Sequence, residues 1–207
     1  MNHSFKQLDI NKQNQILEAA LIEFSKSGYK KASTNNIVEK AGIGKGMLFH
    51  YFNNKKTLFD DLIEISLEFM KKEFIDQIDR SPADFIEKSK RVAKAKMNAM
   101  KKNKLVFEFL GNLYLHEYEG MDEDQINRAL VLQKSMYDLL YNNVDLSVFR
   151  EDIAPEMVMK LIKWSIDGFQ AELVKSLEGT DLEYQDYKED WNDFYAFLET
   201  LKILYYK

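Results

Sequence analysis

The sequence predicts an all-α protein of about nine helices. Every strong apolar period in the chain has helical spacing, and no alternation long enough to indicate a strand is found. Only two prolines and eight glycines occur among 207 residues, which favours long helices over many short strands. Two short helical segments flank a tight Gly42-Ile43-Gly44 turn, a pattern typical of a helix-turn-helix.

Composition limits the kind of chain. Hydrophobic residues make up 45% and charged residues 30%, which is ordinary for a folded, non-membrane chain. There is no cysteine, so disulfides, zinc fingers, iron–sulfur clusters and thiol catalysis are excluded. The N-terminal MNHSFKQLDINKQNQ is polar, and no apolar run approaches the roughly 20 residues that span a bilayer. We therefore expect a cytoplasmic protein.

Charge is unevenly divided along the chain. The whole chain carries −5, but residues 1–57 hold nine lysines and four acidic residues, a net +5, and the remainder carries −10. A basic end on an acidic body indicates that one end meets phosphate, although such asymmetry also arises from solvation alone.

The first helix is predicted from its caps and its apolar stripe, and two short helices follow it. In the first, one apolar face is formed by Ile16, Leu17, Ala20, Leu21 and Phe24. Asp9 or Asn11 can cap its start and Gly28 can end it, and the residues around His3 are expected to form a mobile tail. The second helix is expected over 34–41 and the third over 45–52.

The remaining six elements are longer. Asn54 is expected to cap a fourth helix that fades near Asp79. Ser81 is then the expected cap and Pro82 the first residue of a fifth helix, which reaches residue 102. The others are expected over 105–118, from a cap at Asp122 to 143, over 155–179 and over 187–206.

Helical phase shows which side of the third helix is free. If Leu48 and Phe52 point inward, Gly46 and His50 point outward, with Met47 and Phe49 beside them and Lys45 at the rim. Apolar groups can meet thymine methyls, and lysine can reach guanine acceptors or phosphate. The alternative is that these side chains pack on a neighbouring helix.

The N-terminal quarter resembles the TetR family of bacterial transcriptional regulators. The matching segments are ILEAALIEF, GYKKAST, the AG turn, KG-x-LFHYF, and the following Lys55 and Leu58. The resemblance implies a DNA-binding domain over 1–57 and a helical ligand-binding and dimerisation domain over 58–207. The body agrees with the family only in helix count and length.

By this resemblance, ten residues would meet DNA. Those expected at phosphate or in the major groove are Ser33, Thr34, Asn35, Lys45, Gly46, Met47, Phe49, His50, Tyr51 and Lys55. The first three begin the second helix, the next three enter the groove, the aromatic trio brackets its edge, and Lys55 holds a phosphate. Gly44 and Phe49 depart from the commonest family pattern, which has a capping Ser or Thr and a Tyr there.

The helix expected over 155–179 is apolar on two sides, which calls for two packing partners. One partner would be the core of the protomer and the other a second protomer; a central helix of a monomeric bundle is the alternative. The residues expected at the dimer interface, on this helix and the last one, are Gly168, Phe169, Ala171, Phe194, Phe197 and Leu198.

Aromatic side chains in the body indicate an adaptable apolar pocket with polar groups, and Phe107, Tyr114 and Trp164 are the candidates. Plain core packing is the alternative for each of them. The ferritin-like Glu-x-x-His motif is absent because Leu113 stands three residues before His116. No catalytic site, metal site or cofactor is expected, and the protein is not expected to be an enzyme.

The expected function is that of a regulator, commonly a repressor, that binds a palindromic DNA operator as a homodimer. A small apolar or amphipathic ligand would release it. The alternative is a protein-interaction module of the same fold, whose helix-turn-helix contacts a partner protein. The basic N-terminal charge favours DNA.

Overall fold

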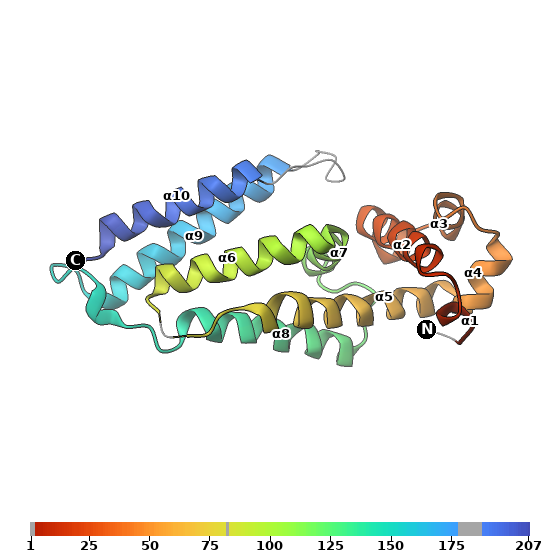
Figure 1. The fold of residues 1–207 in the computed structure, drawn as a ribbon, viewed down its shortest axis with the longest axis horizontal. Helices are drawn as coiled ribbons and strands as arrows, with labels where there is room; N and C mark the ends of the chain where they lie inside the picture. Colours follow the sequence, from red (N-terminus) through yellow and green to blue (C-terminus); the bar gives the residue numbers. More distant parts are fainter. Residues whose placement is uncertain (1–2, 82, 178–187) are drawn as a thin grey trace. The chain divides into compact units, whose positions relative to one another are not determined.

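The computed structural model describes residues 3–81, 83–177 and 188–207, and within them the fold is all-α (Figure 1). One isolated antiparallel bridge joins Phe149 to Tyr206. The ten α-helices are α1 (His3–Lys6), α2 (Ile10–Lys31), α3 (Thr34–Lys40), α4 (Lys45–Phe52), α5 (Lys55–Phe69), α6 (Phe85–Lys102), α7 (Lys104–Leu115), α8 (Glu123–Tyr141), α9 (Pro155–Leu177) and α10 (Lys188–Tyr205). The predicted fold class is confirmed.

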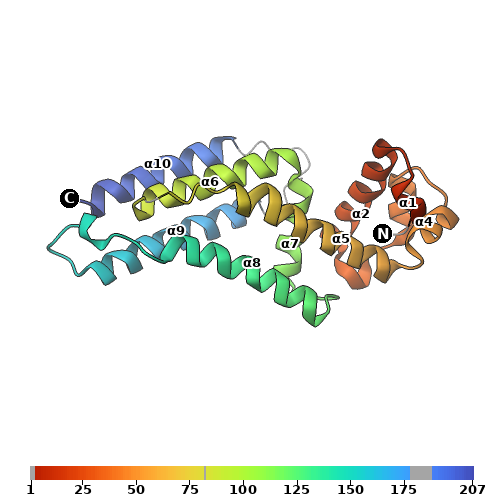
Figure 2. The same ribbon diagram turned by 60° about the horizontal axis from the view of Figure 1, so that its bottom comes forward.

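The chain forms two compact units, each with its own apolar core (Figure 2). One comprises the chain up to Gln77 together with Asn98–Ser135, and the other comprises Ile78–Met97 and Met136–Lys207. Helices α6 and α8 therefore each contribute residues to both. The functional division expected from the sequence, at residue 57, is a different kind of boundary and stays a prediction.

Helix α2 begins and ends where its sequence indicates. The Asp9 side chain accepts a hydrogen bond from the Asn11 amide at 2.9 Å, which caps the first turn. Four of the five predicted stripe residues are buried and Leu17 is half-buried. Gly28 has φ +65°, a conformation that interrupts the helix before Lys31 and that glycine adopts without a Cβ penalty. The predicted end at Gly28 is thus confirmed.

A short helix at the N-terminus corrects the expectation of a mobile tail. Helix α1 spans His3–Lys6, and its Phe5 side chain is fully buried. The Phe5 ring centroid lies 4.9 Å from that of Phe52 and 5.9 Å from that of Tyr51. A single apolar residue within a polar segment therefore anchors α1 to the last turn of α4.

Helix α5 continues beyond its α-helical part. Asn54 caps it by accepting from the Thr57 amide at 2.9 Å, as predicted. A π-helical turn over Met70–Phe74 and a 3₁₀ turn over Ile75–Gln77 follow, so the helical path reaches close to the predicted Asp79. Phe74 and Ile75 are both buried, which explains why the chain stays helical in these irregular turns.

The start of α6 differs from the prediction. Ser81 does not cap it, and the helix begins at Phe85; Pro82 lies outside the described residues. Asp84 accepts from the Glu87 amide at 3.0 Å and from the Tyr206 hydroxyl at 2.9 Å. The Asp84 carboxylate is a stronger acceptor than the Ser81 hydroxyl and is also held by Tyr206, so Asp84 caps the helix. The Ser81 hydroxyl instead accepts a hydrogen bond from Arg91.

The remaining helices agree with the sequence to within a few residues. Helix α7 ends at Leu115, three residues before the predicted Tyr118, because Glu117 and Tyr118 take positive φ. The predicted cap of α8 is confirmed as a reciprocal pair: Asp122 accepts from the Gln125 amide, and Gln125 accepts from the Asp122 amide. The predicted end of α9 at 179 and the predicted start of α10 at 187 lie outside the described residues.

Candidate nucleic-acid interface

Helices α3 and α4 cross in the predicted helix-turn-helix, and their inner faces are apolar. Ile37, Leu48 and Phe52 are at most 1% exposed. Helix α4 has the predicted bounds, and Gly44 precedes it without a side-chain cap. The helix thus begins without the side-chain hydrogen bond that a Ser or Thr would supply.

The outer face of α4 is exposed to solvent, as its phase predicted. Lys45, Gly46 and His50 are exposed, and Met47 is 44% exposed despite being apolar. Phe49 is half-buried at the edge of this face. Within its own protomer the face is uncovered, so the alternative of packing on a neighbouring helix does not apply in the described structure.

The start of α3 is held by two side chains. Ser33 caps the helix, with its hydroxyl 3.5 Å from the Asn36 amide nitrogen. Glu23 on α2 accepts from the Ser33 amide at 2.8 Å and from the Asn36 side-chain amide at 3.2 Å. Thr34 is half-buried and Asn35 exposed. The N-terminus of α3 is therefore fixed in place against α2.

A lysine on α2 fixes the turn. Lys12 Nζ donates to the carbonyls of Ala41 at 3.1 Å and Gly42 at 3.2 Å, and to the Gln15 side chain at 3.3 Å. Carbonyls at a helix C-terminus carry partial negative charge, so a cation is favoured there. No role for Lys12 could be predicted from the sequence, because its partners are backbone atoms 29 and 30 residues away.

Lys55 is placed differently from the sequence expectation. Its Nζ donates to the carbonyls of Tyr29 at 2.7 Å, Lys30 at 3.2 Å and Ala32 at 3.2 Å. The ammonium also lies 4.9 Å from the centroid of the Tyr29 ring. Its three protons are thereby matched to three acceptors at the C-terminal end of α2, which leaves none for a phosphate. In this structure Lys55 positions α5 against α2.

Tyr51 also differs from its expected role at the groove edge. Its side chain is buried, with 7% exposure, and its ring contacts the rings of Phe5, Phe52 and His50. The exposed member of the HYF segment is His50. Tyr51 therefore acts mainly as packing between α1 and α4.

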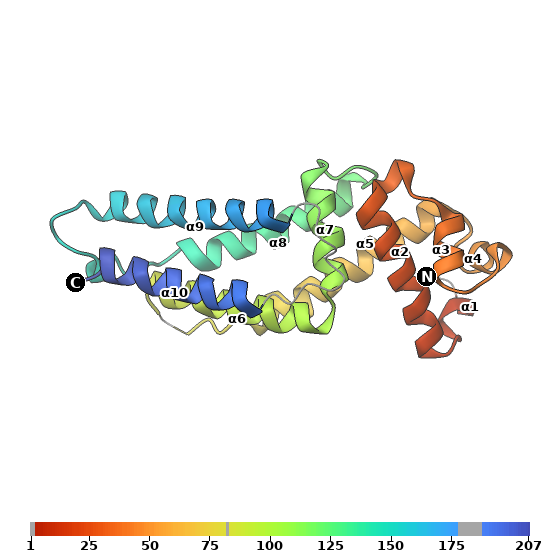
Figure 3. The same ribbon diagram turned by 90° about the horizontal axis from the view of Figure 1, so that it is seen from above.

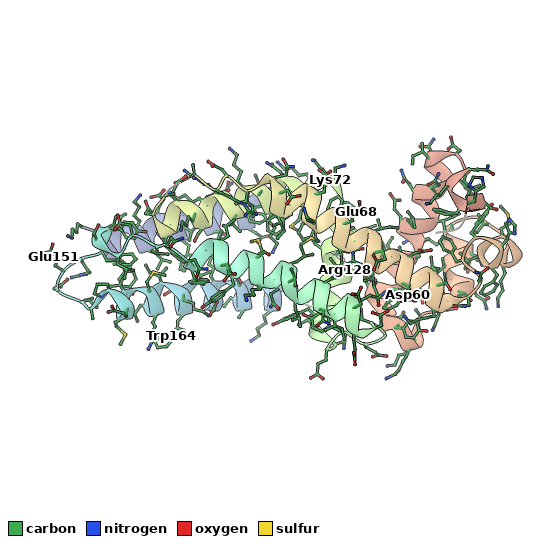
Figure 4. The ribbon with its side chains drawn as sticks, turned by 90° about the horizontal axis from the view of Figure 1, so that it is seen from below. Asp60, Glu68, Lys72, Arg128, Glu151 and Trp164 are labelled. Atoms are coloured by element: carbon green, nitrogen blue, oxygen red, sulfur yellow. The ribbon has the colours of Figure 1, made fainter. Side chains whose placement is uncertain are left out.

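The predicted ligand-binding residues do not share one environment. The Phe107 ring packs against Phe69 and Phe74, with centroids 6.4 and 6.0 Å away. Tyr114 is 57% exposed and belongs to the same unit. Trp164 belongs to the other unit, is 60% exposed, and points outward from α9 (Figure 4). Phe107 is thus the one of the three that the structure places against the α5 segment.

The predicted dimer residues lie on α9 and α10 (Figure 3). Gly168 and Ala171 are exposed, in line with Met157 and Trp164 on one side of α9. Phe169, Phe194 and Phe197 are half-buried and pack on one another, with centroids 4.9 to 6.4 Å apart. Leu198 is fully buried within its own protomer, so its side chain packs in the core behind this face and is not exposed on it.

Comparison with known proteins relates the N-terminal part of this chain to a protein family. Residues 16–62 match the family model for bacterial regulatory proteins of the tetR family. The uncharacterized HTH-type transcriptional regulator YhgD of Bacillus subtilis is 35% identical over 65 residues, which cover 31% of this chain and 34% of that protein. The HTH-type transcriptional repressor KstR2 of Mycobacterium tuberculosis is 22% identical over 158 residues, which cover 74% of this chain and 76% of that protein.

The likeness extends to whole solved structures. The structure of KstR2 superposes with a TM-score of 0.64 at 19% identity, covering 97% of each chain. A TetR family transcriptional regulator from Chloroflexus aurantiacus gives a TM-score of 0.60 at 14% identity, covering 100% of this chain and 98% of that one. At these identities the likeness concerns the fold.

The match over residues 16–62 and the exposed α4 are those of a helix-turn-helix DNA-binding domain of a transcriptional regulator. More narrowly, this N-terminal part is similar to the tetR family of bacterial regulatory proteins, and the described fold resembles that of a solved TetR family regulator. Across the described ranges, no helix is long and apolar enough to cross a membrane.

Proposed function

We propose that the protein is a homodimeric repressor that binds a palindromic DNA operator and is released by a small apolar or amphipathic ligand. The observation that carries this proposal is the exposed outer face of α4, with Lys45, Gly46 and Met47 at its start, beside the capped start of α3. This is the geometry in which a recognition helix enters the major groove by its N-terminal residues.

The proposed DNA contacts divide into two kinds. Ser33, Thr34 and Asn35 at the start of α3 would meet the phosphate backbone, where a helix N-terminus favours an anion. Lys45, Gly46 and Met47 would meet base edges, with Phe49 and His50 at the edge of the groove. Lys12 and Lys55 would act indirectly, by holding the turn and α5 in place.

Dimerisation is supported by the outward apolar stripe of α9, which comprises Met157, Trp164, Gly168 and Ala171. On α10, Ile203 is 81% exposed and Leu204 is 50% exposed. Exposed apolar side chains arranged in line on two packed helices are typical of an interface. A dimer that pairs α9 and α10 with their mates would present two α4 helices to half-sites about one helical turn apart, or a multiple of it.

Release by a ligand requires a link between the body and α5. Two polar contacts supply one within a single unit: Gln125 on α8 donates to Asp60 on α5 at 3.1 Å, and Arg128 pairs with Glu64 (Figure 4). A ligand near Phe107 that shifts α7 or α8 would move α5, whose first residue, Lys55, holds the end of α2. The ligand must bind the DNA-incompetent state more tightly to change operator affinity.

A gel-shift titration over a range of salt concentrations tests the proposal. Fragments of the promoter region next to the coding gene would be compared with an unrelated duplex of equal length. We expect binding to the promoter fragment to fall steeply as salt rises, because phosphate contacts release counterions. Binding to neither duplex at low salt would contradict the proposal and favour a protein-interaction module.

A further inference from the structure

The sulfur atoms of this chain all belong to methionine. The sequence has no cysteine and nine methionines, so thioethers are the sulfur groups that an oxidant can attack. Among the described residues, Met47 and Met157 are exposed, at 44% and 45%. The other methionines that the structure describes are half-buried: Met70, Met97, Met100, Met121, Met136 and Met159.

Met47 lies on the outer face of α4, near the start of the helix. Gly44 and Gly46 stand three and one positions before it, and neither has a side chain that could cover the thioether. Lys45 and His50 on the same side of the helix are also exposed. The Met47 side chain is therefore presented on the surface that is proposed to enter the major groove.

Met157 provides a matched comparison. Its exposure in the protomer is nearly that of Met47, but it lies on α9, in the outward apolar stripe with Trp164 and Gly168. The two side chains thus share the chemistry of an exposed thioether and differ in the element that carries it. An effect on DNA binding that depends on Met47 and not on Met157 would come from α4.

A hydroperoxide oxidises an exposed thioether by transferring one oxygen atom to it. The sulfur lone pair attacks a peroxide oxygen, the O–O bond breaks and an S–O bond forms; with hydrogen peroxide, the second product is water. The sulfur loses two electrons and the peroxide gains them, so no further reactant is needed. The apolar side chain becomes a polar sulfoxide, and methionine sulfoxide reductases reverse the change.

This change at Met47 would oppose DNA binding. In the major groove an apolar side chain can contact the methyl group of thymine. A sulfoxide oxygen brought to the same place would lose its hydrating water, and a polar group that is buried without a hydrogen-bond partner costs free energy. Because Met47 is exposed in the protomer, the sulfoxide should leave the fold of α4 intact.

We propose that Met47 is a reversible oxidation site through which hydroperoxides lower the affinity for the operator. This inference rests on the proposed function, in which α4 enters the major groove. Bound DNA covers Met47 and should slow its oxidation. The site therefore responds to peroxide mainly in protein that is not bound to the operator.

The first test follows oxidation of the full-length protein by hydrogen peroxide, with mass spectrometry of its peptides. Without DNA, Met47 should be oxidised faster than each of the half-buried methionines. Saturation with the promoter fragment should slow the oxidation of Met47 several-fold and leave the half-buried methionines unaffected. Oxidation of Met47 that is no faster than theirs, or that bound DNA does not slow, would overturn the proposal.

The second test measures operator affinity by gel shift before and after peroxide treatment, and each protein is compared with its own untreated form. Wild type should lose affinity at least about tenfold, because both protomers lose an apolar contact in the groove. Methionine sulfoxide reductases should restore it. Met47→Leu should lose little affinity on treatment, whereas Met157→Leu, the matched control, should lose as much as wild type. Circular dichroism of the treated proteins checks that the helices remain folded.

Two results of the second test would also overturn the proposal: a Met47→Leu protein that loses as much affinity as wild type, or a Met157→Leu protein that loses none. Untreated wild type that binds neither duplex would refute the proposed function and this regulation with it. Oxidation of Met47 that leaves operator affinity unchanged would refute the regulation alone.

Discussion

The helix-turn-helix and the α9–α10 hairpin both expose apolar side chains, but they are built differently. Around α3 and α4, Lys12 and Lys55 donate to backbone carbonyls and Glu23 accepts from a backbone amide, and these hydrogen bonds fix short helices that could not hold their positions alone. In α9 and α10, long helices pack through Phe169, Phe194 and Phe197, and an outward apolar stripe is left uncovered.

The difference indicates what each surface meets. Met47 lies two residues after Lys45 in the basic N-terminal segment. Its exposed methyl group can therefore contact a ligand that also carries negative charge, as DNA does. Trp164 and Gly168 lie on a stripe that a second copy of the same stripe can cover by two-fold symmetry. Four substitutions test this comparison, beginning with the one expected to have the largest effect.

Gly168→Arg should abolish the dimer. A Cβ at Gly168 would meet no atom within 4 Å in the protomer, so the monomer can fold, but a long charged side chain would separate two copies of α9. Operator affinity should fall by at least about 100-fold, because a monomer contacts only one half-site. Sedimentation at micromolar concentration measures the first effect, with Gly168→Ala as the control. A wild-type monomer would end the dimer proposal.

Lys55→Met should destabilise the helix-turn-helix. Removing three hydrogen bonds from a charged donor to carbonyls, two of them part-buried, should lower the free energy of unfolding by about 2 kcal/mol. Denaturant titration measures this, and Lys56→Met, which removes only an ion pair to Asp60 within α5, should cost much less.

The salt dependence of operator binding sharpens the result for Lys55. If the Lys55 ammonium donates only to backbone carbonyls of its own protomer and not to DNA, the slope of log affinity against log salt should be unchanged in Lys55→Met. A slope reduced by about one per protomer would instead show that Lys55 contacts phosphate in the complex.

Lys45→Ala should weaken operator binding by about tenfold while leaving stability unchanged, since the side chain is exposed at the start of α4. The salt slope should fall by about one per protomer if Lys45 meets phosphate. Lys134 is an exposed lysine on α8, and Lys134→Ala serves as the control for a general loss of positive charge. Equal effects of the two substitutions would argue against a specific contact.

Asp84→Ala should have the smallest effect, a loss of about 1 kcal/mol of stability typical of a helix N-cap. Ser81→Ala should cost less, because Ser81 does not cap α6. The reverse order in thermal melts would restore Ser81 as the cap.

Local signals predicted the helices well because caps and apolar stripes act within one or two turns. The bounds of α4, the caps Asp9, Asn54 and Asp122, and the break at Gly28 depend on residues within four positions of one another. The outward face of α4 followed from the same local phase.

The features that the sequence did not predict depend on distant partners. Lys55 finds its acceptors 23 to 26 residues earlier in the chain, and Asp84 is favoured as a cap by Tyr206 at the other end. Phe5 carried a usable signal, an apolar residue in a polar segment, but its partners on α4 could not be identified from spacing.

The close packing around Gly120 has a consequence for how the protein tolerates change. A Cβ there would lie 2.8 Å from the Tyr29 ring and 3.0 Å from Phe59, and the backbone has φ +88°. Two independent constraints thus select glycine, whereas Gly46, Gly111 and Gly168 have open space around them. In a saturation mutagenesis library selected for folded protein, position 120 should accept no other residue, while those three positions should accept alanine freely.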